Sequence, residues 1–154
     1  MIFLTILVIS IFFGGANASS ELSLDLTGYV DPEVNIERID DNGEVMDIFS
    51  RRESRYRITS NVDKGVRINF STQYNWRLKH ETLSDQFIPF YGVFRGVNKT
   101  EIVGKESDSV EVDRSDFVDG EYEFSMIFHS NIRMKELHSG KYYGRIIISV
   151  SAAS

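Results

Sequence analysis

Apolar and polar residues alternate along most of this chain, and this period of two constrains the fold more than any other feature of the sequence. Successive side chains of a β-strand point to opposite faces, so an alternating segment forms a strand with one buried and one solvated face. The alternation occurs in segments 56–59, 66–71, 74–78, 87–94, 110–112, 122–128 and 143–150, with Ile36 and residues 45–49 before them. The pattern therefore predicts half-buried strands.

Turn-forming residues separate these segments. Gly, Asn and Asp gather at 40–43, 61–65, 96–98, 104, 119–120 and 139–140, and these residue types favour turns. Strands rich in Tyr, Phe, Val and Ile at a spacing of roughly ten residues are typical of an all-β sandwich. The helix-like window 131–138 is short, and we interpret it as a loop or a single turn. We find no repeat, low-complexity segment or second domain.

The sequence contains no cysteine and carries a formal net charge of −6. Disulfides, thiolate metal ligands and a cysteine nucleophile are therefore excluded, so packing and strand pairing must stabilise the domain. An acidic chain without a dense basic segment is poorly suited to nucleic acid, because phosphate neutralisation requires clustered Lys and Arg. We expect no nucleic-acid partner.

The N-terminus has the layout of a secretory signal peptide. A mostly apolar run over residues 1–15 leads into the small-residue triplet Ala16-Asn17-Ala18. An apolar run of about a dozen residues before such a triplet is typical of signal peptides and is too short to span a membrane comfortably. We interpret residues 1–18 as a signal peptide cleaved after Ala18. Because no Lys or Arg precedes the apolar run, an uncleaved N-terminal anchor is the alternative.

A second alternating segment, residues 22–30, follows the leader. One face of the expected strand carries Leu22, Leu24, Leu26, Gly28 and Val30. A glycine inside a strand commonly marks a point where another segment approaches the backbone closely. Pro32 then ends the ladder, because proline has no N–H. The segment is either the first strand of an ordinary sandwich or a strand that projects from its own domain.

Both ends of the exported sequence carry motifs that resemble one family. Segment 22–34, Leu-Ser-Leu-Asp-Leu-Thr-Gly-Tyr-Val-Asp-Pro-Glu-Val, resembles the mature N-terminus of chaperone–usher pilins, most of all the cysteine-free alternate chaperone–usher subunits of the colonisation-factor type. Segment 139–151, Ser-Gly-Lys-Tyr-Tyr-Gly-Arg-Ile-Ile-Ile-Ser-Val-Ser, is similar to the Gly-x-Tyr-x-Gly ending of that family. The middle of the chain matches only in the rhythm of its strands.

This resemblance implies an immunoglobulin-like β-sandwich that lacks its final strand and is completed by donor-strand complementation. Residues 19–31 would be the N-terminal donor-strand extension and residues 32–154 the pilin-like domain. The inserted donor residues would be Leu22, Leu24, Leu26, Gly28 and Val30, and the edge of the acceptor groove would be formed by Ile146, Ile148 and Val150. The implied partners are further subunits, a periplasmic chaperone and an outer-membrane usher, and a glycan or protein on a host surface is a candidate receptor.

The sequence shows no motif of an enzyme. His80, His129 and His138 lack the spacing of a metal site, and no nucleophile elbow, phosphate loop or dinucleotide motif occurs. We therefore expect no catalytic residues, no cofactor and no metal.

Two features admit both a structural and a binding interpretation. The arginine-rich segment 51–57, which includes Tyr56, is interpreted as a solvated face and alternatively as a patch for an acidic glycan or a partner subunit. Trp76, close to Tyr74, is interpreted as a core residue and alternatively as a platform for a sugar.

Together these observations favour a structural subunit of a bacterial surface fimbria, exported through the periplasm, that polymerises head to tail. The alternative is a self-contained secreted or periplasmic β-sandwich that binds a glycan or a protein. These two hypotheses differ in whether the strand at 22–30 pairs within its own domain or projects from it.

Overall fold

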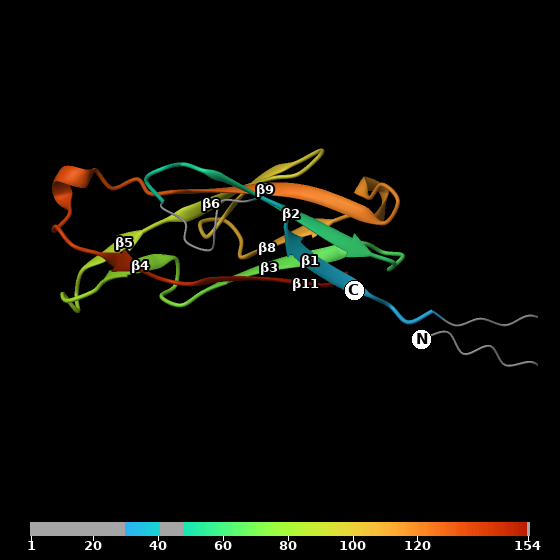
Figure 1. Cartoon of the computed structure of the whole chain (residues 1–154), viewed down its shortest axis with the longest axis horizontal. Helices are drawn as coiled ribbons and strands as arrows, with labels where there is room; N and C mark the ends of the chain where they lie inside the picture. Colours follow the sequence, from blue (N-terminus) through green and yellow to red (C-terminus); the bar gives the residue numbers. More distant parts are fainter. Residues whose placement is uncertain (1–29, 41–47, 154) are drawn as a thin grey trace, which may run out of the picture. The chain divides into compact units, whose positions relative to one another are not determined.

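Strands form nearly all the regular structure of the described residues. The computed structural model describes residues 30–40 and 48–153, and its compact folded unit runs from Pro32 to Ser154. Figure 1 shows the strands, which are β1 (Val34–Arg38), β2 (Glu53–Ser60), β3 (Val66–Thr72), β4 (Arg77–His80), β5 (Phe87–Pro89), β6 (Tyr91–Arg95), β7 (Thr100–Val103), β8 (Ser109–Val112), β9 (Glu121–His129), β10 (Tyr142–Tyr143) and β11 (Ile146–Ala152). Two short 3-10 helices, η1 (Arg114–Asp116) and η2 (Met134–Glu136), accompany them. Within these ranges, no helix has the length and apolar character needed to cross a membrane.

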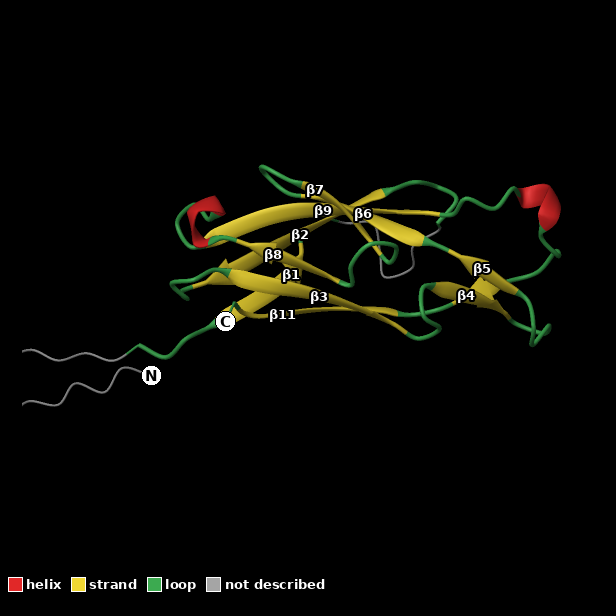
Figure 2. Ribbon diagram, turned by 180° about the vertical axis from the view of Figure 1, so that it is seen from behind, coloured by secondary structure: helices red, strands yellow, loops and turns green. Residues whose placement is uncertain are grey.

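The strands form two main antiparallel sheets and a small third sheet. The first main sheet has the order β1-β2-β9-β6-β7, the second β11-β3-β8, and the small sheet β10-β4-β5. In Figure 2 the two main sheets form the layers of a sandwich, and β4 and β5 lie beyond one end of it. The prediction of an all-β sandwich is confirmed.

The core lies between the main sheets and contains the alternate residues of their strands. In β3, Val66, Ile68 and Phe70 are all buried. From the opposite sheet, Phe94 of β6 and Phe124 of β9 stack with ring centroids 4.9 Å apart. Burying one large apolar side chain contributes about 1.5–3 kcal/mol. Packing of this kind stabilises a domain that has no disulfide.

The predicted strand at 74–78 is wrong in its first half. Asn75 and Trp76 have φ angles of 50° and 58° and lie in a turn, and β4 begins only at Arg77. Left-handed backbone is unfavourable for a bulky residue, so tertiary contacts must hold Trp76 there. Its backbone N–H donates to Thr72 Oγ1 at 2.6 Å, and its indole Nε1 donates to Asp108 at 2.7 Å.

Trp76 is a core residue, which was the first of its two interpretations. Its side chain is 7% exposed and packs on Phe90 with ring centroids 5.5 Å apart. A Cβ at Gly104 would lie 2.3 Å from the indole ring, so only glycine fits against it. This burial rules out Trp76 as an exposed platform for a sugar.

Two further strand predictions are refined by the structure, and one strand was not predicted. Ile48 and Phe49 lie in a turn rather than a strand, and residues 41–47 lie outside the described residues. Segment 87–94 divides into β5 and β6 at Phe90. β7 was not predicted, because its sequence Thr-Glu-Ile-Val has two adjacent apolar residues in place of an alternating pattern. The window 131–138 is a loop with the single turn η2, as predicted.

Candidate functional site

The last strand, β11, lies at the edge of its sheet. Residues 146–152 pair antiparallel with β3, with Ile148 opposite Phe70 and Val150 opposite Ile68. Within the described residues, no second strand pairs with the other side of β11. The backbone N–H and C=O groups on that side are therefore available to a further strand.

The inward side chains of β11 are only half-buried. Ile146, Ile148 and Val150 pack against the core, yet each keeps part of its surface exposed. The β3 partners of Val150 and Ile148 are enclosed, with Ile68 at 0% and Phe70 at 4% exposure. Covering apolar surface contributes about 25 cal/mol per Å². A strand added beside β11 would thus gain free energy from packing as well as from backbone hydrogen bonds.

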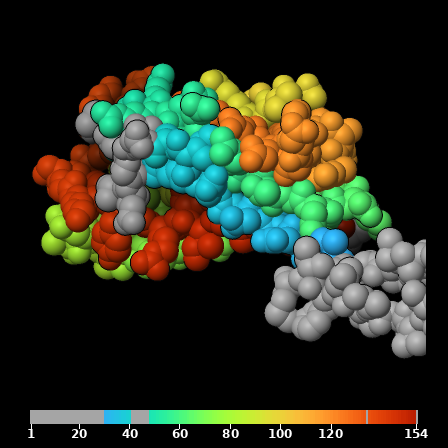
Figure 3. Space-filling view, turned by 45° about the vertical axis from the view of Figure 1, so that its right-hand side comes forward, coloured from blue at the N-terminus to red at the C-terminus, as the bar shows by residue number. Residues whose placement is uncertain are grey.

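Strand β1, at the edge of the other main sheet, lies beside β11 at this boundary. Its inward residues Val34 and Ile36 are also half-buried against the core. β1 pairs with β2 and contacts β11 without a hydrogen-bonded ladder between them. Figure 3 shows β1 in cyan and β11 in red next to one another on one face. Half-buried apolar residues therefore flank the boundary between the sheets from both sides.

The opposite edge of the same sheet, β8, is protected by side chains. The Ser107 hydroxyl donates to the Ser109 carbonyl at 2.7 Å and accepts from the Ser109 N–H at 3.0 Å. Lys99 Nζ donates to the Glu111 carbonyl at 2.6 Å. Proteins use lysines and other blocking groups at edge strands to prevent pairing with other chains. In the part of the chain that the structure describes, no side chain covers the edge of β11 in this way, so the two edges of one sheet differ.

The strand order is that of an immunoglobulin-type sandwich with one position open. Such a domain has strands A, B, E and D in one sheet and C, F and G in the other. β1, β2, β9 and β6 have the order of A, B, E and D, and β3 and β11 correspond to C and F. The position of strand G, next to β11, is not filled by any strand among residues 30–40 and 48–153.

Comparisons with known proteins return fimbrial structures. No protein-family model and no curated protein matches this sequence. The chain is similar to a chain from the chaperone–tip adhesin complex of CFA/I fimbriae, with 10% identity and a TM-score of 0.45, over 80% of this chain and 42% of that one. It is also similar to the CooA pilin subunit from enterotoxigenic Escherichia coli, with 18% identity and a TM-score of 0.44, over 67% of this chain and 71% of that one. This chain thus spans less than half the length of the first structure.

The predicted donor strand lies almost entirely outside the described residues. Leu22, Leu24, Leu26 and Gly28 belong to the part that is not described, as does the predicted signal peptide. Val30 is described and its side chain is exposed. The roles of these residues, and those of Ile146, Ile148 and Val150 as the border of a groove, stay predictions.

The buried His80 has a structural role at the end of β4. Its Nδ1 accepts hydrogen bonds from the N–H groups of Thr82 and Leu83, each at 3.1 Å. Because Nδ1 accepts, the ring is neutral and Nε2 carries the proton, which it donates to the Ser139 carbonyl at 3.1 Å. Both ring nitrogens are therefore occupied by the backbone of neighbouring loops.

The C-terminal Gly-x-Tyr-x-Gly motif packs on this histidine. Gly140 has a φ of 145°, and a Cβ there would lie 2.2 Å from His80 Nε2. Tyr142 packs edge-on against the His80 ring, with centroids 4.8 Å apart. At Gly144 a Cβ would lie 2.9 Å from the Leu78 side chain. The motif thus packs β10 against β4, and the chain continues from it into β11.

The described ranges contain no cluster of side chains suited to a metal ion. No group of three His, Asp or Glu residues among residues 30–40 and 48–153 is placed to hold a metal ion. His129 stacks with Tyr91, with ring centroids 5.6 Å apart. Burial, together with Arg51 and Arg95, lowers the pKa of His129.

The arginine-rich segment forms an ion-pair network on the outer face of the first sheet. Arg57 lies 2.8 Å from Glu123, 3.4 Å from Glu121 and 3.5 Å from Glu37. Arg55 also reaches Glu123, at 3.4 Å. The hydrogen bond from Arg57 lowers the pKa of Glu123. Arg55 and Arg57 are thus neutralised on a solvated face, in agreement with the first interpretation of the segment. Its alternative role as a patch for an acidic glycan or a partner subunit stays a prediction.

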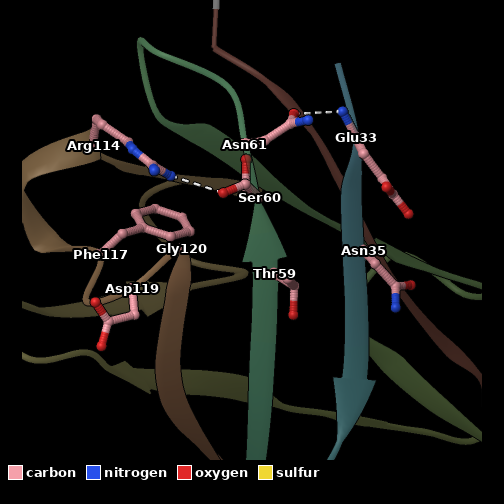
Figure 4. Close-up of a pocket in the computed structure, with 9 residues that line it drawn as sticks. All are labelled: Glu33, Asn35, Thr59, Ser60, Asn61, Arg114, Phe117, Asp119 and Gly120. Atoms are coloured by element: carbon pink, nitrogen blue, oxygen red, sulfur yellow. Dashed lines mark hydrogen bonds between the residues drawn. The ribbon is translucent and has the colours of Figure 1, made fainter. Parts of the chain in front are cut away.

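A cavity of about 600 Å³ lies where β1, β2 and β9 meet. Figure 4 shows its lining residues, Glu33, Asn35, Thr59, Ser60, Asn61, Arg114, Phe117, Asp119 and Gly120. Arg114, the cation of this lining, donates to the Ser60 carbonyl at 2.8 Å, and Asn61 Oδ1 accepts from the Glu33 N–H at 2.7 Å. These hydrogen bonds join the ends of neighbouring strands, which is a structural role.

Proposed function

We propose that this chain is a structural subunit of a bacterial surface fibre that polymerises head to tail. In this proposal the segment 19–31 of one subunit inserts beside β11 of the next. The observation that carries the proposal is the edge of β11, where half-buried apolar side chains coincide with backbone groups that pair with no strand among residues 30–40 and 48–153.

The alternating face of segment 22–30 is the counterpart of that edge. A strand beside β11 forms main-chain hydrogen bonds, while its alternate side chains cover Ile146, Ile148 and Val150. Leu22, Leu24, Leu26 and Val30 would supply those side chains, and Gly28 would admit a close neighbour. Because donor and acceptor are different surfaces, the contact is heterologous and propagates into a fibre.

The remaining parts of the proposal follow from the same edge. An unpaired edge with exposed apolar residues invites aggregation before assembly, so the subunit requires a partner that covers it during export. A periplasmic chaperone and an outer-membrane usher would fill this role, and the predicted leader 1–18 would direct the chain to them. The fibre would lie on the cell surface.

Because the sequence has no cysteine, engineered cysteines test this proposal directly. Each of Ser23→Cys, Asp25→Cys and Thr27→Cys, on the outer face of the donor segment, is combined in one chain with Ser149→Cys on the outer face of β11. Fibres assembled in cells with the matching chaperone and usher are then oxidised mildly and separated on non-reducing gels. One donor position is expected to give a ladder of disulfide-linked subunits, because directly opposed residues come within disulfide range.

Ser109→Cys provides the matched control for Ser149→Cys. Both serines lie opposite Asn69 of β3, Ser149 on β11 and Ser109 on β8. The donor cysteines are expected to form no ladder with Ser109→Cys, since that edge is protected. Equal ladders from the two edges, or no ladder with Ser149→Cys at any donor position, would contradict the proposal.

A further inference from the structure

A second cavity, of about 350 Å³, lies between the start of β4 and the junction of β5 and β6. Its lining includes Asn75, Trp76, Arg77, Tyr91, Lys105 and Asn131. A volume of this size is within the range of roughly 300–1,000 Å³ found for sites of small ligands. The cavity belongs to the folded unit and is separate from the edge of β11.

The charged residues that line this cavity are all positive. Arg77 and Lys105 line it, and none of its lining residues is acidic. Within the described residues neither cation has a carboxylate partner, in contrast to Arg55 and Arg57. The nearby Asp108 accepts a hydrogen bond from the indole of Trp76. Two unpaired cations at one cavity of a chain with a net charge of −6 favour an anionic ligand.

Neighbouring aromatic rings hold both cations in place. Lys105 Nζ lies 3.8 Å from the centroid of the Tyr91 ring, and the Arg77 guanidinium lies 4.9 Å from that of Phe87. Cation–π contacts of this kind restrict the long side chains while leaving their N–H donors free. Arg77 Nε donates to the Tyr74 carbonyl at 3.3 Å, which leaves the terminal nitrogens of its guanidinium for a ligand.

Two amides and a hydroxyl complete the polar lining. The Tyr91 hydroxyl donates to Asn131 Oδ1 at 3.4 Å, so the amide nitrogen of Asn131 keeps both of its donors. Asn75 is exposed, next to the buried Trp76. Neutral amide donors and acceptors suit hydroxyl groups, whereas the cations suit a carboxylate.

We propose that this cavity binds a sugar acid, that is, a saccharide that carries a carboxylate. Arg77 and Lys105 hold the carboxylate, and Asn75 and Asn131 hold hydroxyl groups of the same sugar. The proposal does not depend on the assembly of fibres. Trp76 lines the cavity, but the proposed contacts to the sugar come from Arg77, Lys105, Asn75 and Asn131 and not from the tryptophan ring or the arginine-rich strand.

Binding of 3′-sialyllactose to the purified full chain tests the proposal. Lactose, the disaccharide part of this ligand without the sugar that carries the carboxylate, is the neutral probe. Titration followed by NMR is expected to show saturable binding of sialyllactose and binding of lactose at least about tenfold weaker. Arg77→Ala and Lys105→Ala are each expected to weaken sialyllactose binding about tenfold. Lys64→Ala, which removes an exposed cation from the loop between β2 and β3, is expected to change nothing.

Three outcomes of the saccharide titrations would overturn the proposal. These are equal binding of lactose and sialyllactose, no saturable binding of either, and unchanged affinity in both cavity variants. Inorganic phosphate serves as a fourth probe. If phosphate binds as tightly as sialyllactose and competes with it, the cavity recognises an anion only and the assignment to a sugar acid is wrong. Thermal unfolding of every variant confirms that the exposed substitutions leave the fold intact.

Discussion

Ile148 of β11 lies directly opposite Phe70 of β3, yet Phe70 is 4% exposed while Ile148 is only half-buried. Residues opposite one another on the same face of a sheet share their surroundings unless one of them lacks a further neighbour. Phe70 has strands on both sides, because β3 is the central strand of its sheet. The difference in burial therefore identifies the side of β11 as the incomplete part of the sandwich.

The donor face is expected to be sensitive to charge. Leu26→Asp places a carboxylate where an apolar groove would close over it, at a cost of several kcal/mol. Gly28→Trp is expected to block the same contact by its bulk. Both variants should be exported and bound by the chaperone but fail to form fibres, as seen by electron microscopy of the cell surface.

Thr27→Asp is the control for the donor face, because it introduces the same charge on the opposite face of the segment. Fibres of this variant should resemble those of the unmodified chain. If Leu26→Asp and Gly28→Trp also gave normal fibres, insertion of this strand would not be the means of assembly.

Removal of the side chains that cover the edge of β8 is expected to let this edge pair with other chains. Lys99→Met combined with Ser107→Ala removes the side chains that bond to the backbone of Ser109 and Glu111. Exposed edge groups promote pairing between chains. Light scattering should show faster aggregation of the double variant than of Lys64→Met combined with Ser139→Ala. Equal aggregation rates would mean that the protection of β8 is unimportant.

Gly140→Ala is expected to destabilise the domain by about 2–3 kcal/mol, because the new methyl group meets the His80 ring and the φ of 145° is strained for alanine. Gly120→Ala also lies at a positive φ, but its Cβ would be 3.3 Å from the nearest atom. It should cost only about 1 kcal/mol. Denaturant unfolding measures both, and equal losses would show that the packing on His80 contributes nothing.

Because of Tyr122, the free energy of unfolding is expected to fall at alkaline pH. Its hydroxyl is buried without a hydrogen-bond partner among the described residues, and burial raises the pKa of Tyr122 to about 12 from the ordinary value of 10.0. The folded state therefore holds this proton more tightly than the unfolded state. The resulting stability is fully present below pH 10 and is lost as the pH rises towards 12.

Tyr122→Phe removes both this titration and the unpaired hydroxyl. Denaturant unfolding at about pH 9 and about pH 11 should show a smaller loss of stability in the variant than in the unmodified chain. At the lower pH the variant should be as stable or slightly more stable, because removing a buried hydroxyl without a partner costs little. An identical pH dependence of the two proteins would contradict this account of Tyr122.

Much of the fold could be predicted from local patterns. The alternation in β3, β9 and β11 identified their inward residues, among them Ile146, Ile148 and Val150, and the Asp119-Gly120 pair marked a hairpin turn. These predictions succeed because the face to which a strand side chain points depends only on its position along the strand. The turn at Asn75 and Trp76 escaped prediction, since the contacts that hold it come from Asp108 and Gly104.

The sequence by itself determined that this protein is an all-β sandwich without disulfides and which side chains of β3, β9 and β11 face the core. Only the tertiary structure decided that β8 is a protected edge and β11 an open one, and that Arg77 and Lys105 share a cavity while Arg55 and Arg57 are neutralised. The physical reason is that alternation is a property of neighbours along the chain. Edges, ion pairs and cavities depend instead on which distant strands pair. The alternation of apolar and polar residues does not specify that pairing.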